Sequence, residues 1–213
     1  MRLLCIADKV APVLYSPEVK NYKVDAVLAA GDLDMDYYEY IVTVLGKPLY
    51  FVFGNHNLTA WPFFKESNIQ EQLAGYGSQC IEDKVINLNK GQLLIAGLGG
   101  SKLYNGGLSQ YTEGQMLWRI VRLIPRLVFN KIKYGRYLDI LLSHAPPYRL
   151  GDDIDPCHEG FKIFRWFLKK FKPTYQLHGH IHLDDINLPR VRRYEKSALI
   201  NCYNYFILEY KTP

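Results

Sequence analysis

The sequence predicts an α/β fold in which short strands alternate with helices around one core. Three observations carry this prediction. Short apolar, β-branched segments recur along the chain, several of them end on polar residues, and helical patterns lie between them. The chain has 213 residues, and no internal repeat, low-complexity tract or change in composition marks a linker. We therefore expect a single domain over residues 1–213.

The first part of the chain supplies three expected strands and one helix. Residues 2–7, 25–30 and 49–53 are apolar runs that end on polar or glycine residues, which is typical of buried strands. Residues 37–45 have a helical pattern, and Gly46-Lys47-Pro48 ends that helix. This alternation of strands with a helix is typical of an α/β domain.

The middle of the chain predicts a hairpin and a long helix. Residues 85–88 and 93–98 flank Asn89-Lys90-Gly91, a typical turn sequence. Thr112-Glu113-Gly114-Gln115 fits a capping box and opens a helix, which Pro125 should break or restart. The remaining expected elements are a strand at 138–142, a helix at 161–171, and strands at 175–177, 198–202 and 205–210.

Composition excludes several classes of protein. Apolar residues make up 48% of the chain and charged residues 22%, which rules out a disordered, collagen-like or coiled-coil protein. The net charge of +5 suits anionic ligands but is too diffuse to indicate nucleic-acid binding. Aromatic residues reach 14%, and 17 of them are Tyr, which can line a groove as well as fill a core.

The expected location is the cytoplasm, with no membrane partner. The opening apolar run, residues 1–7, is too short for a signal-peptide core, and no later run approaches the length of a membrane span. Cys5, Cys80, Cys157 and Cys202 are far apart and form no C-x-x-C pair. We therefore expect neither a disulfide framework nor a zinc–thiolate site.

Polar residues follow the ends of five expected strands. The carboxyl ends of strands are where open α/β sheets place their sites. One such group carries little signal, but five in one chain, each after an apolar strand, indicate a shared site. The five groups are Asp8, Gly31-Asp32, Gly54-Asn55-His56, Ser143-His144 and Gly179-His180-Ile181-His182.

These groups offer carboxylate, amide and imidazole ligands. Mixed oxygen and nitrogen ligands suit divalent Mn, Fe, Zn or Co better than Ca. His180 and His182 are two positions apart, so in an extended segment both side chains face the same side. The glycines at 31, 54 and 179 allow sharp turns and a close approach of the backbone to a ligand.

The same groups give the chain a resemblance to the calcineurin-like metallophosphoesterases. The signature of that family is D-x-H, then G-D, then G-N-H-D/E, then a lone H in a strand-end loop, and finally G-H-x-H. The matching blocks run from Asp8 to His182 and include Ser143-His144-Ala145-Pro146-Pro147. The resemblance implies a four-layer α-β-β-α sandwich of two mixed sheets, with a two-metal centre at one edge of the sheets.

The resemblance also implies roles for single residues. Asp32 is expected to bridge both metals. His56 is expected to be the catalytic imidazole, which lies beside the leaving group rather than on a metal. The other expected ligands are Asn55, His144 and His180 for the second metal, and Asp8 and His182 for the first.

Two positions depart from the family pattern. The D-x-H block reads Asp8-Lys9-Val10, so the first metal lacks its histidine, and Asn57 takes the last place of G-N-H-D/E. Losing an imidazole weakens the first site, whereas the second site keeps its ligands. A one-metal enzyme, an exchangeable first metal and a substitute ligand from elsewhere in the chain all stay open.

The resemblance implies a metal-dependent phosphoester hydrolase, either a phosphodiesterase or a phosphomonoesterase, with a small phosphorylated substrate. Two divalent ions (Mn, Fe, Zn, Ni or Co) would activate a water as hydroxide, while His56 would donate a proton to the departing oxygen or stabilise its developing charge. Two alternatives stay open: a nuclease acting on DNA or RNA, and a non-catalytic scaffold that holds protein partners. The sequence indicates no oligomeric state.

Three features lie outside these blocks. His158 and Gly160 form an H-x-G at the expected start of a helix, as in relatives, so His158 is a candidate to contact the substrate phosphate; a plain helix-start role is the alternative. His178 shares the strand parity of His180, but the family does not use that position as a ligand. The region after Thr112 is strongly basic, which indicates solvated helix faces or a surface for a polyanion.

Overall fold

The first strand of the chain is buried on both of its faces. In β1 (Arg2–Ala7), Leu3 and Cys5 point to one side of the sheet, and Leu4 and Ile6 point to the other. All four side chains are fully buried, which explains why the strand is a continuous apolar run rather than an alternating one. The computed structural model describes residues 1–56, 77–185 and 187–211.

The sheet that contains β1 has five strands in the order β13-β1-β2-β3-β4. Neighbours from β1 to β4 run parallel, and β13 pairs antiparallel with β1. The parallel strands therefore end at the same edge of this sheet. The other strands are β2 (Ala26–Ala29), β3 (Leu49–Phe51), β4 (Ser78–Cys80) and β13 (Asn204–Glu209).

The second sheet has six strands in the order β11-β12-β10-β9-β6-β5. The central strands β12, β10, β9 and β6 are parallel, and antiparallel strands close both edges. Both sheets are thus mixed. The bounds are β5 (Val85–Leu88), β6 (Leu93–Leu98), β9 (Ile140–Ser143), β10 (Tyr175–His178), β11 (Val191–Tyr194) and β12 (Ser197–Asn201).

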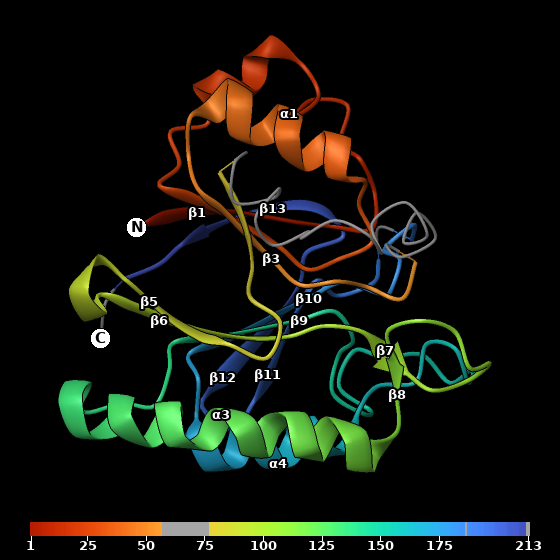
Figure 1. Cartoon of the computed structure of the whole chain (residues 1–213). Helices are drawn as coiled ribbons and strands as arrows, with labels where there is room; N and C mark the ends of the chain where they lie inside the picture. The colour runs from red at the N-terminus through yellow and green to blue at the C-terminus, as the bar shows by residue number, and fades with distance from the viewer. Residues whose placement is uncertain (57–76, 186, 212–213) are drawn as a thin grey trace, which may run out of the picture.

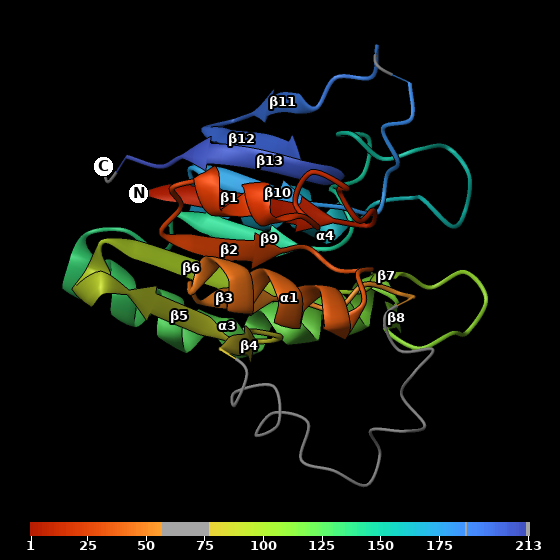
Figure 2. The same cartoon turned by 90° about the horizontal axis from the view of Figure 1, so that it is seen from above.

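The two sheets stack face to face, and helices cover their outer faces (Figure 1). Helix α1 (Met35–Leu45) lies on the first sheet, where Tyr38 and Ile41 pack against Leu4. Helices α3 (Glu113–Tyr134) and α4 (Lys162–Phe171) lie on the second sheet. Between the sheets is a third apolar cluster, and Figure 2 shows the same layers from above. The predicted four-layer α-β-β-α sandwich is confirmed.

Short elements complete the chain. The 3₁₀ turn η1 (Pro17–Asn21) follows β1, and the 3₁₀ turn η3 (Asn89–Gly91) joins β5 to β6. Strands β7 (Ser101–Lys102) and β8 (Gln110–Tyr111) form a separate parallel pair. Strands β4, β7, β8 and β11 were not predicted, because they are short and only weakly apolar. In the described part of the chain, no helix is both long enough and apolar enough to cross a bilayer.

The capping box at the start of α3 is confirmed, whereas the expected break at Pro125 is wrong. The Thr112 Oγ1 accepts from the Gln115 N–H at 3.2 Å, and the Gln115 side chain accepts from the Thr112 N–H at 2.8 Å. The helix continues through Pro125 to Tyr134. Pro125 is exposed, so the carbonyl that loses its helical partner faces solvent, where water can replace the missing N–H.

Candidate metal centre

The expected site residues meet where the parallel strands of both sheets end. Asp8 directly follows β1, and Asp32 lies three residues beyond β2. His144 directly follows β9, and His180 lies two residues beyond β10. Backbone bonds also join neighbouring strand ends within each sheet at this edge. The N–H of Asp8 donates to the Gly31 carbonyl at 3.1 Å, and the N–H of Gly179 donates to the His144 carbonyl at 3.0 Å.

Three of these residues have a backbone conformation that residues other than glycine rarely adopt. The φ angles are 62° at Asp8, 55° at Asp32 and 70° at His180. Left-handed backbone at non-glycine residues costs free energy and persists where the surrounding structure imposes it, often at functional sites. The turns after β1, β2 and β10 are therefore held in unusual shapes that direct these three side chains.

Two glycines leave the space that the carboxylates occupy. A Cβ on Gly54 would lie 2.0 Å from the Asp32 Oδ1 and 2.7 Å from the His144 Cε1. A Cβ on Gly179 would lie 2.5 Å from the Asp8 Oδ2. Real Cβ atoms do not approach other atoms so closely, so any side chain at either position would displace a carboxylate. The backbone at residues 54 and 179 therefore closely approaches the carboxylates of Asp32 and Asp8.

Asp8, Asp32 and His144 form a group that fits a metal ion. One ligand atom from each lies within 4.8 Å of those of the other two. The His144 Nε2 is 3.2 Å from the Asp32 Oδ2 and 3.0 Å from the Asn55 Oδ1. Both oxygens are acceptors, so this arrangement is favourable only with a cation among them, either a proton on Nε2 or a metal. The donor chemistry of the group therefore fits a divalent ion.

A backbone carbonyl fixes the orientation of each central imidazole. The His144 Nδ1–H donates to the Ala30 carbonyl at 2.7 Å, which leaves Nε2 for a ligand role. The His180 Nε2–H donates to the Cys157 carbonyl at 2.8 Å, which leaves Nδ1. The two rings have centroids 4.9 Å apart. Such outer contacts are what metal-bound histidines need to fix their tautomer.

Backbone N–H groups hold the two carboxylates. The His180 N–H donates to both oxygens of Asp8 at 3.0 Å, and the His56 N–H donates to the Asp32 Oδ1 at 2.8 Å. Each carboxylate is therefore tied to the strand end of a different ligand-bearing segment. Asp8 is half-buried and Asp32 has a side chain that is 10% exposed.

The environment shifts the pKa of every central group. Burial raises the pKa of Asp8 to about 7, although the His144 charge opposes this. Burial alone would raise the pKa of Asp32, but His144 outweighs it and holds that pKa below its usual range. Burial would lower the pKa of His144, but Asp32 outweighs it and raises that pKa to about 9. For His180 burial dominates and lowers the pKa to about 3, so this imidazole is neutral.

His182 and His56 lie at the rim of the centre. His182 is exposed and stacks on Tyr203, with ring centroids 5.0 Å apart. It belongs to neither metal-ligand group found in the described part of the chain. The His56 side chain is exposed, and its charge helps to lower the pKa of Asp32, so the imidazole is close to that carboxylate. Asn57, the second departure from the family signature, lies outside the described residues.

A second group of ligand-type side chains lies in the loop before α4. Asp155, Cys157 and His158 each place a ligand atom within 4.8 Å of the others. The His158 Nδ1–H donates to the Asp155 Oδ2 at 2.8 Å, and the Cys157 Sγ–H donates to the Asp155 Oδ1 at 2.8 Å. The His158 ring lies 5.2 Å from the ring of His180 and 6.5 Å from that of His182.

This loop group was only partly predicted. His158 was a candidate from the sequence, whereas Asp155 and Cys157 were not among the candidate site residues. The available signal was the short spacing of Asp155-Pro156-Cys157-His158, which places three ligand types within four residues. Val10, at the position of the missing histidine, has no ligand atom and is 39% exposed.

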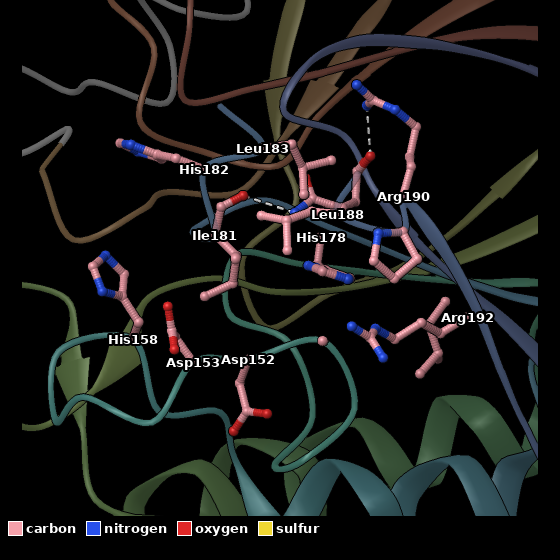
Figure 3. Close-up of a pocket in the computed structure, with 14 residues that line it drawn as sticks. Asp152, Asp153, His158, His178, Ile181, His182, Leu183, Leu188, Arg190 and Arg192 are labelled. Atoms are coloured by element: carbon pink, nitrogen blue, oxygen red, sulfur yellow. Dashed lines mark hydrogen bonds between the residues drawn. The ribbon is translucent and has the colours of Figure 1, made fainter. Parts of the chain in front are cut away.

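A cavity of about 230 Å³ adjoins the rim of the centre. In Figure 3, His158 and His182 lie on one side of this cavity and Arg192 on the other, with His178 between them. The His178 Nδ1–H donates to the Gly179 carbonyl at 3.0 Å, and burial lowers the pKa of this residue to about 4. His178 is thus a neutral imidazole in the cavity wall, a role that the sequence did not indicate.

Part of the predicted basic surface is structural. Arg119 is buried and pairs with Glu82 and, at 2.6 Å, with Asp83. Arg190 donates to the carbonyls of Asn201 and Tyr203 at 2.8 Å and 3.0 Å. These two cations therefore hold the fold together and are not available to a polyanion.

Comparisons with known proteins agree with the fold. The family model described as calcineurin-like phosphoesterase (Metallophos) matches residues 6–184. One solved crystal structure is 13% identical, with a TM-score of 0.69, over 97% of this chain and 94% of the other. The crystal structure of TT1561 of Thermus thermophilus is 15% identical, with a TM-score of 0.63, over 95% of this chain and 89% of the other. At such low identity these structures show the fold alone.

No curated protein matches the chain at a significant level. The family model covers the blocks from Asp8 to His182, which are the segments that the structure brings to one sheet edge. Because the match spans most of the chain, the protein belongs to the calcineurin-like phosphoesterase family.

Proposed function

We propose that this protein is a metal-dependent phosphoester hydrolase that acts on a small organic phosphate. The observation that carries the proposal is the convergence of Asp8, Asp32 and His144, whose ligand atoms all lie within 4.8 Å of one another. Membership of the calcineurin-like phosphoesterases, whose members are typically hydrolases, supports the same reaction class. Assays with a monoester and a diester distinguish the two kinds of substrate.

The residues divide into two expected metal positions. Asp32 would be a ligand of both. Asn55, His144 and His180 would complete the second position, and Asp8 and His182 would complete the first. When bound, divalent ions of the Mn, Fe, Zn, Ni or Co type lower the pKa of a water and neutralise charge on the phosphoryl oxygens.

The chain itself supplies orientation. The Ala30 carbonyl binds the Nδ1 of His144, which leaves its Nε2 as a possible ligand atom. The Cys157 carbonyl binds the Nε2 of His180, which leaves its Nδ1. The N–H groups of His56 and His180 fix the two carboxylates. Backbone contacts of this kind reduce the reorganisation that is needed when a substrate binds.

His56 is the proposed proton donor to the leaving oxygen. Its backbone is tied to Asp32, while its imidazole is exposed at the rim, where a departing group would leave for solvent. A general acid of this kind contributes about 10²–10⁴-fold. His56→Ala should therefore slow hydrolysis by about a hundredfold, and more for an alkyl leaving group than for nitrophenolate, which needs no protonation. An equal loss of rate with both leaving groups would contradict the proposed role of His56.

The cavity beside the centre is the proposed site for the rest of the substrate. Its wall combines the Arg192 cation and the neutral His178 with apolar Leu183 and Leu188. His158 stands between this cavity and His180, a position suited to contacting the phosphate. The net charge of +5 helps to attract such an anion.

Hydrolysis of p-nitrophenyl phosphate and of bis(p-nitrophenyl) phosphate, each with Mn, Fe, Zn, Ni and Co, tests the function. We expect turnover of at least one ester, and a loss of about a hundredfold or more in Asp32→Asn. Asp36→Asn is the matched control, since that carboxylate is exposed on α1. No turnover with any ion would favour the scaffold alternative. Salt-sensitive cleavage of DNA or RNA in place of small esters would favour the nuclease.

A further inference from the structure

The outward side of α3 is apolar, although the opposite side of the same helix already contacts the second sheet. Trp118 is 68% exposed and Ile132 is 81% exposed. Figure 1 shows α3 in the outermost layer of the molecule, beside α4. The exposed apolar side chains of α3, here called the outer stripe, are Leu117, Trp118, Val121, Val128, Phe129 and Ile132.

The six residues of the outer stripe lie together on one side of the helix. At about 100° per residue, its six members fall within an arc of about 120°. The buried residues Met116, Ile120, Leu123 and Leu127 fall on the other side and pack in the core of the second sheet. The outer stripe therefore contributes nothing to the core, and an exposed apolar area of this extent indicates an interaction surface.

Basic side chains border the outer stripe on both sides. Arg122, Arg126 and Lys133 lie along one border and Lys131 along the other, and all four are exposed. Phe129 lies between two of these cations, with its centroid 5.2 Å from the Arg126 guanidinium carbon and 5.7 Å from the Lys133 Nζ.

Among the residues that the structure describes, few acidic groups lie near this surface. Glu113, the single acidic residue of α3, accepts from the N–H groups of Lys162 and Ile163 at the start of α4, at 2.8 Å and 3.0 Å. Asp83 lies 3.8 Å from Arg122 but is also paired with the buried Arg119. The exposed side of α3 is thus apolar along its middle and positive along its borders.

The neighbouring helix extends the same chemistry. On α4, Trp166 is 42% exposed and Lys170 is exposed, and α3 and α4 lie side by side on the second sheet. Tryptophan beside Lys and Arg is the combination found where proteins meet the headgroup region of a bilayer. Long basic side chains can lie over apolar surface while their charges reach phosphate.

We propose that the outer stripe and its basic borders dock this protein on an anionic lipid bilayer, with α3 lying in the plane of the headgroups. The apolar arc enters the boundary between headgroups and acyl chains, and the flanking cations meet lipid phosphates. The expectation of no membrane partner rested on the lack of a spanning segment. A helix that lies on the surface needs no such segment.

The charge pattern favours a bilayer over other occupants. A second copy packed stripe to stripe would bring the same basic borders together, and like charges oppose that contact. A nucleic acid would use the cations but would leave six apolar side chains without a partner. An anionic bilayer supplies both an apolar interior and a negative surface.

Co-sedimentation with vesicles tests the proposal directly. The full chain is mixed with vesicles of phosphatidylcholine alone or of phosphatidylcholine and phosphatidylglycerol in equal parts. We expect binding to the anionic vesicles only, weakening as salt is raised. Arg126→Glu with Lys133→Glu should weaken it by at least tenfold, since each cation near an anionic surface contributes about fivefold. Trp118→Ser with Ile132→Ser should weaken it by on the order of tenfold.

Two control variants sit on the opposite outer layer. Val13→Ser changes an exposed apolar residue near α1, and Lys20→Glu with Lys23→Glu reverses two exposed cations there. Both should leave vesicle binding unchanged. Since all substituted side chains are exposed, unchanged circular dichroism and melting temperature should confirm that every variant is folded.

Several results would overturn the proposal. One is equal binding to neutral and anionic vesicles, and another is binding that survives both outer-stripe variants. A concentration-dependent dimer lost in Trp118→Ser with Ile132→Ser, without vesicle binding, would assign the outer stripe to a second copy. DNA binding lost only in the charge variant, again without vesicle binding, would assign the cations to nucleic acid.

Discussion

The two halves of the metal centre differ in how firmly the fold holds them. The half around His144 is buried, and each of its imidazoles has a backbone partner on the side away from the centre. The half around Asp8 is open: Val10 offers no ligand, and His182 is an exposed side chain stacked on Tyr203. The proposed second metal position is therefore preorganised by the fold, whereas the proposed first position depends on what the loops supply.

The largest effect should come from His144→Ala. His144 is fully buried and partners Asp32, Asn55 and the Ala30 carbonyl at once. Its loss leaves a mostly buried carboxylate without its cation, so the metal-free protein should lose about 3 kcal/mol of unfolding free energy. Urea denaturation measures this, and metal binding should be lost as well.

His178→Ala is the control for removing a buried imidazole. His178 is also buried, but it lines the cavity rather than the centre. It should lose stability and still bind metal. If His144→Ala bound metal as well as His178→Ala does, the buried half would not be the metal site.

Gly54→Ala should be the next largest effect. The added methyl would lie 2.0 Å from the Asp32 Oδ1, so the carboxylate has to move away from His144. Since small misplacements of catalytic groups cost about 10²-fold, we expect hydrolysis to fall by about a hundredfold. Gly114→Ala is the matched control, because a Cβ there meets nothing closer than 4.0 Å and only favours the helix. Equal activity in the two variants would show that Asp32 is not confined as described.

Val10→His should strengthen the open half. The change restores the imidazole that the family pattern places two residues after Asp8. We expect the weaker of two metal affinities to rise by about tenfold, or about 1.4 kcal/mol, while the tighter one stays the same. Isothermal titration with Mn or Co measures both. A change confined to the tighter affinity would mean that the two positions have been assigned the wrong way round.

Asp155→Asn should have the smallest effect. Asp155 holds the His158 ring by accepting from its Nδ1–H, and the side chains are about two-fifths exposed, at 42% and 38%. An exposed pair of this kind contributes little, so we expect a change of a few-fold in KM and no change in kcat. Asp36→Asn, which removes an exposed carboxylate on α1, is the control. A fall in kcat with unchanged KM would give His158 a part in the chemistry instead of in substrate contact.

The comparison of the two halves also shows what the sequence could predict. The strand-end groups and their order follow from apolar runs that end on ligand-type residues, and the four-layer fold was expected from the family resemblance that these groups carry. The outer partners did not follow, because Ala30 and Cys157 act through their carbonyls, which every residue possesses. The imidazole orientation therefore depends on three-dimensional contacts that leave no mark on residue type.

The long helix α3 illustrates the same limit differently. Thr112 and Gln115 correctly predicted its capping box, whereas the break predicted at Pro125 was wrong. A proline on the solvent side of a helix removes a hydrogen bond that water can replace, so the helix continues. The basic residues after Thr112 looked alike in the sequence. The structure separates the buried Arg119, which pairs with Glu82, from the exposed Arg126 and Lys133 on the border of the outer stripe.

The amount of metal that the protein retains after loading tests whether the two halves of the proposed centre bind metal with unequal affinity. The protein is loaded with Mn or Co and desalted, and its bound metal is measured beside that of His144→Ala and His182→Ala. We predict one tightly held ion per chain in the wild type, lost in His144→Ala and kept in His182→Ala. Retention of no divalent ion by the wild type, or loss in His182→Ala but not in His144→Ala, would contradict it.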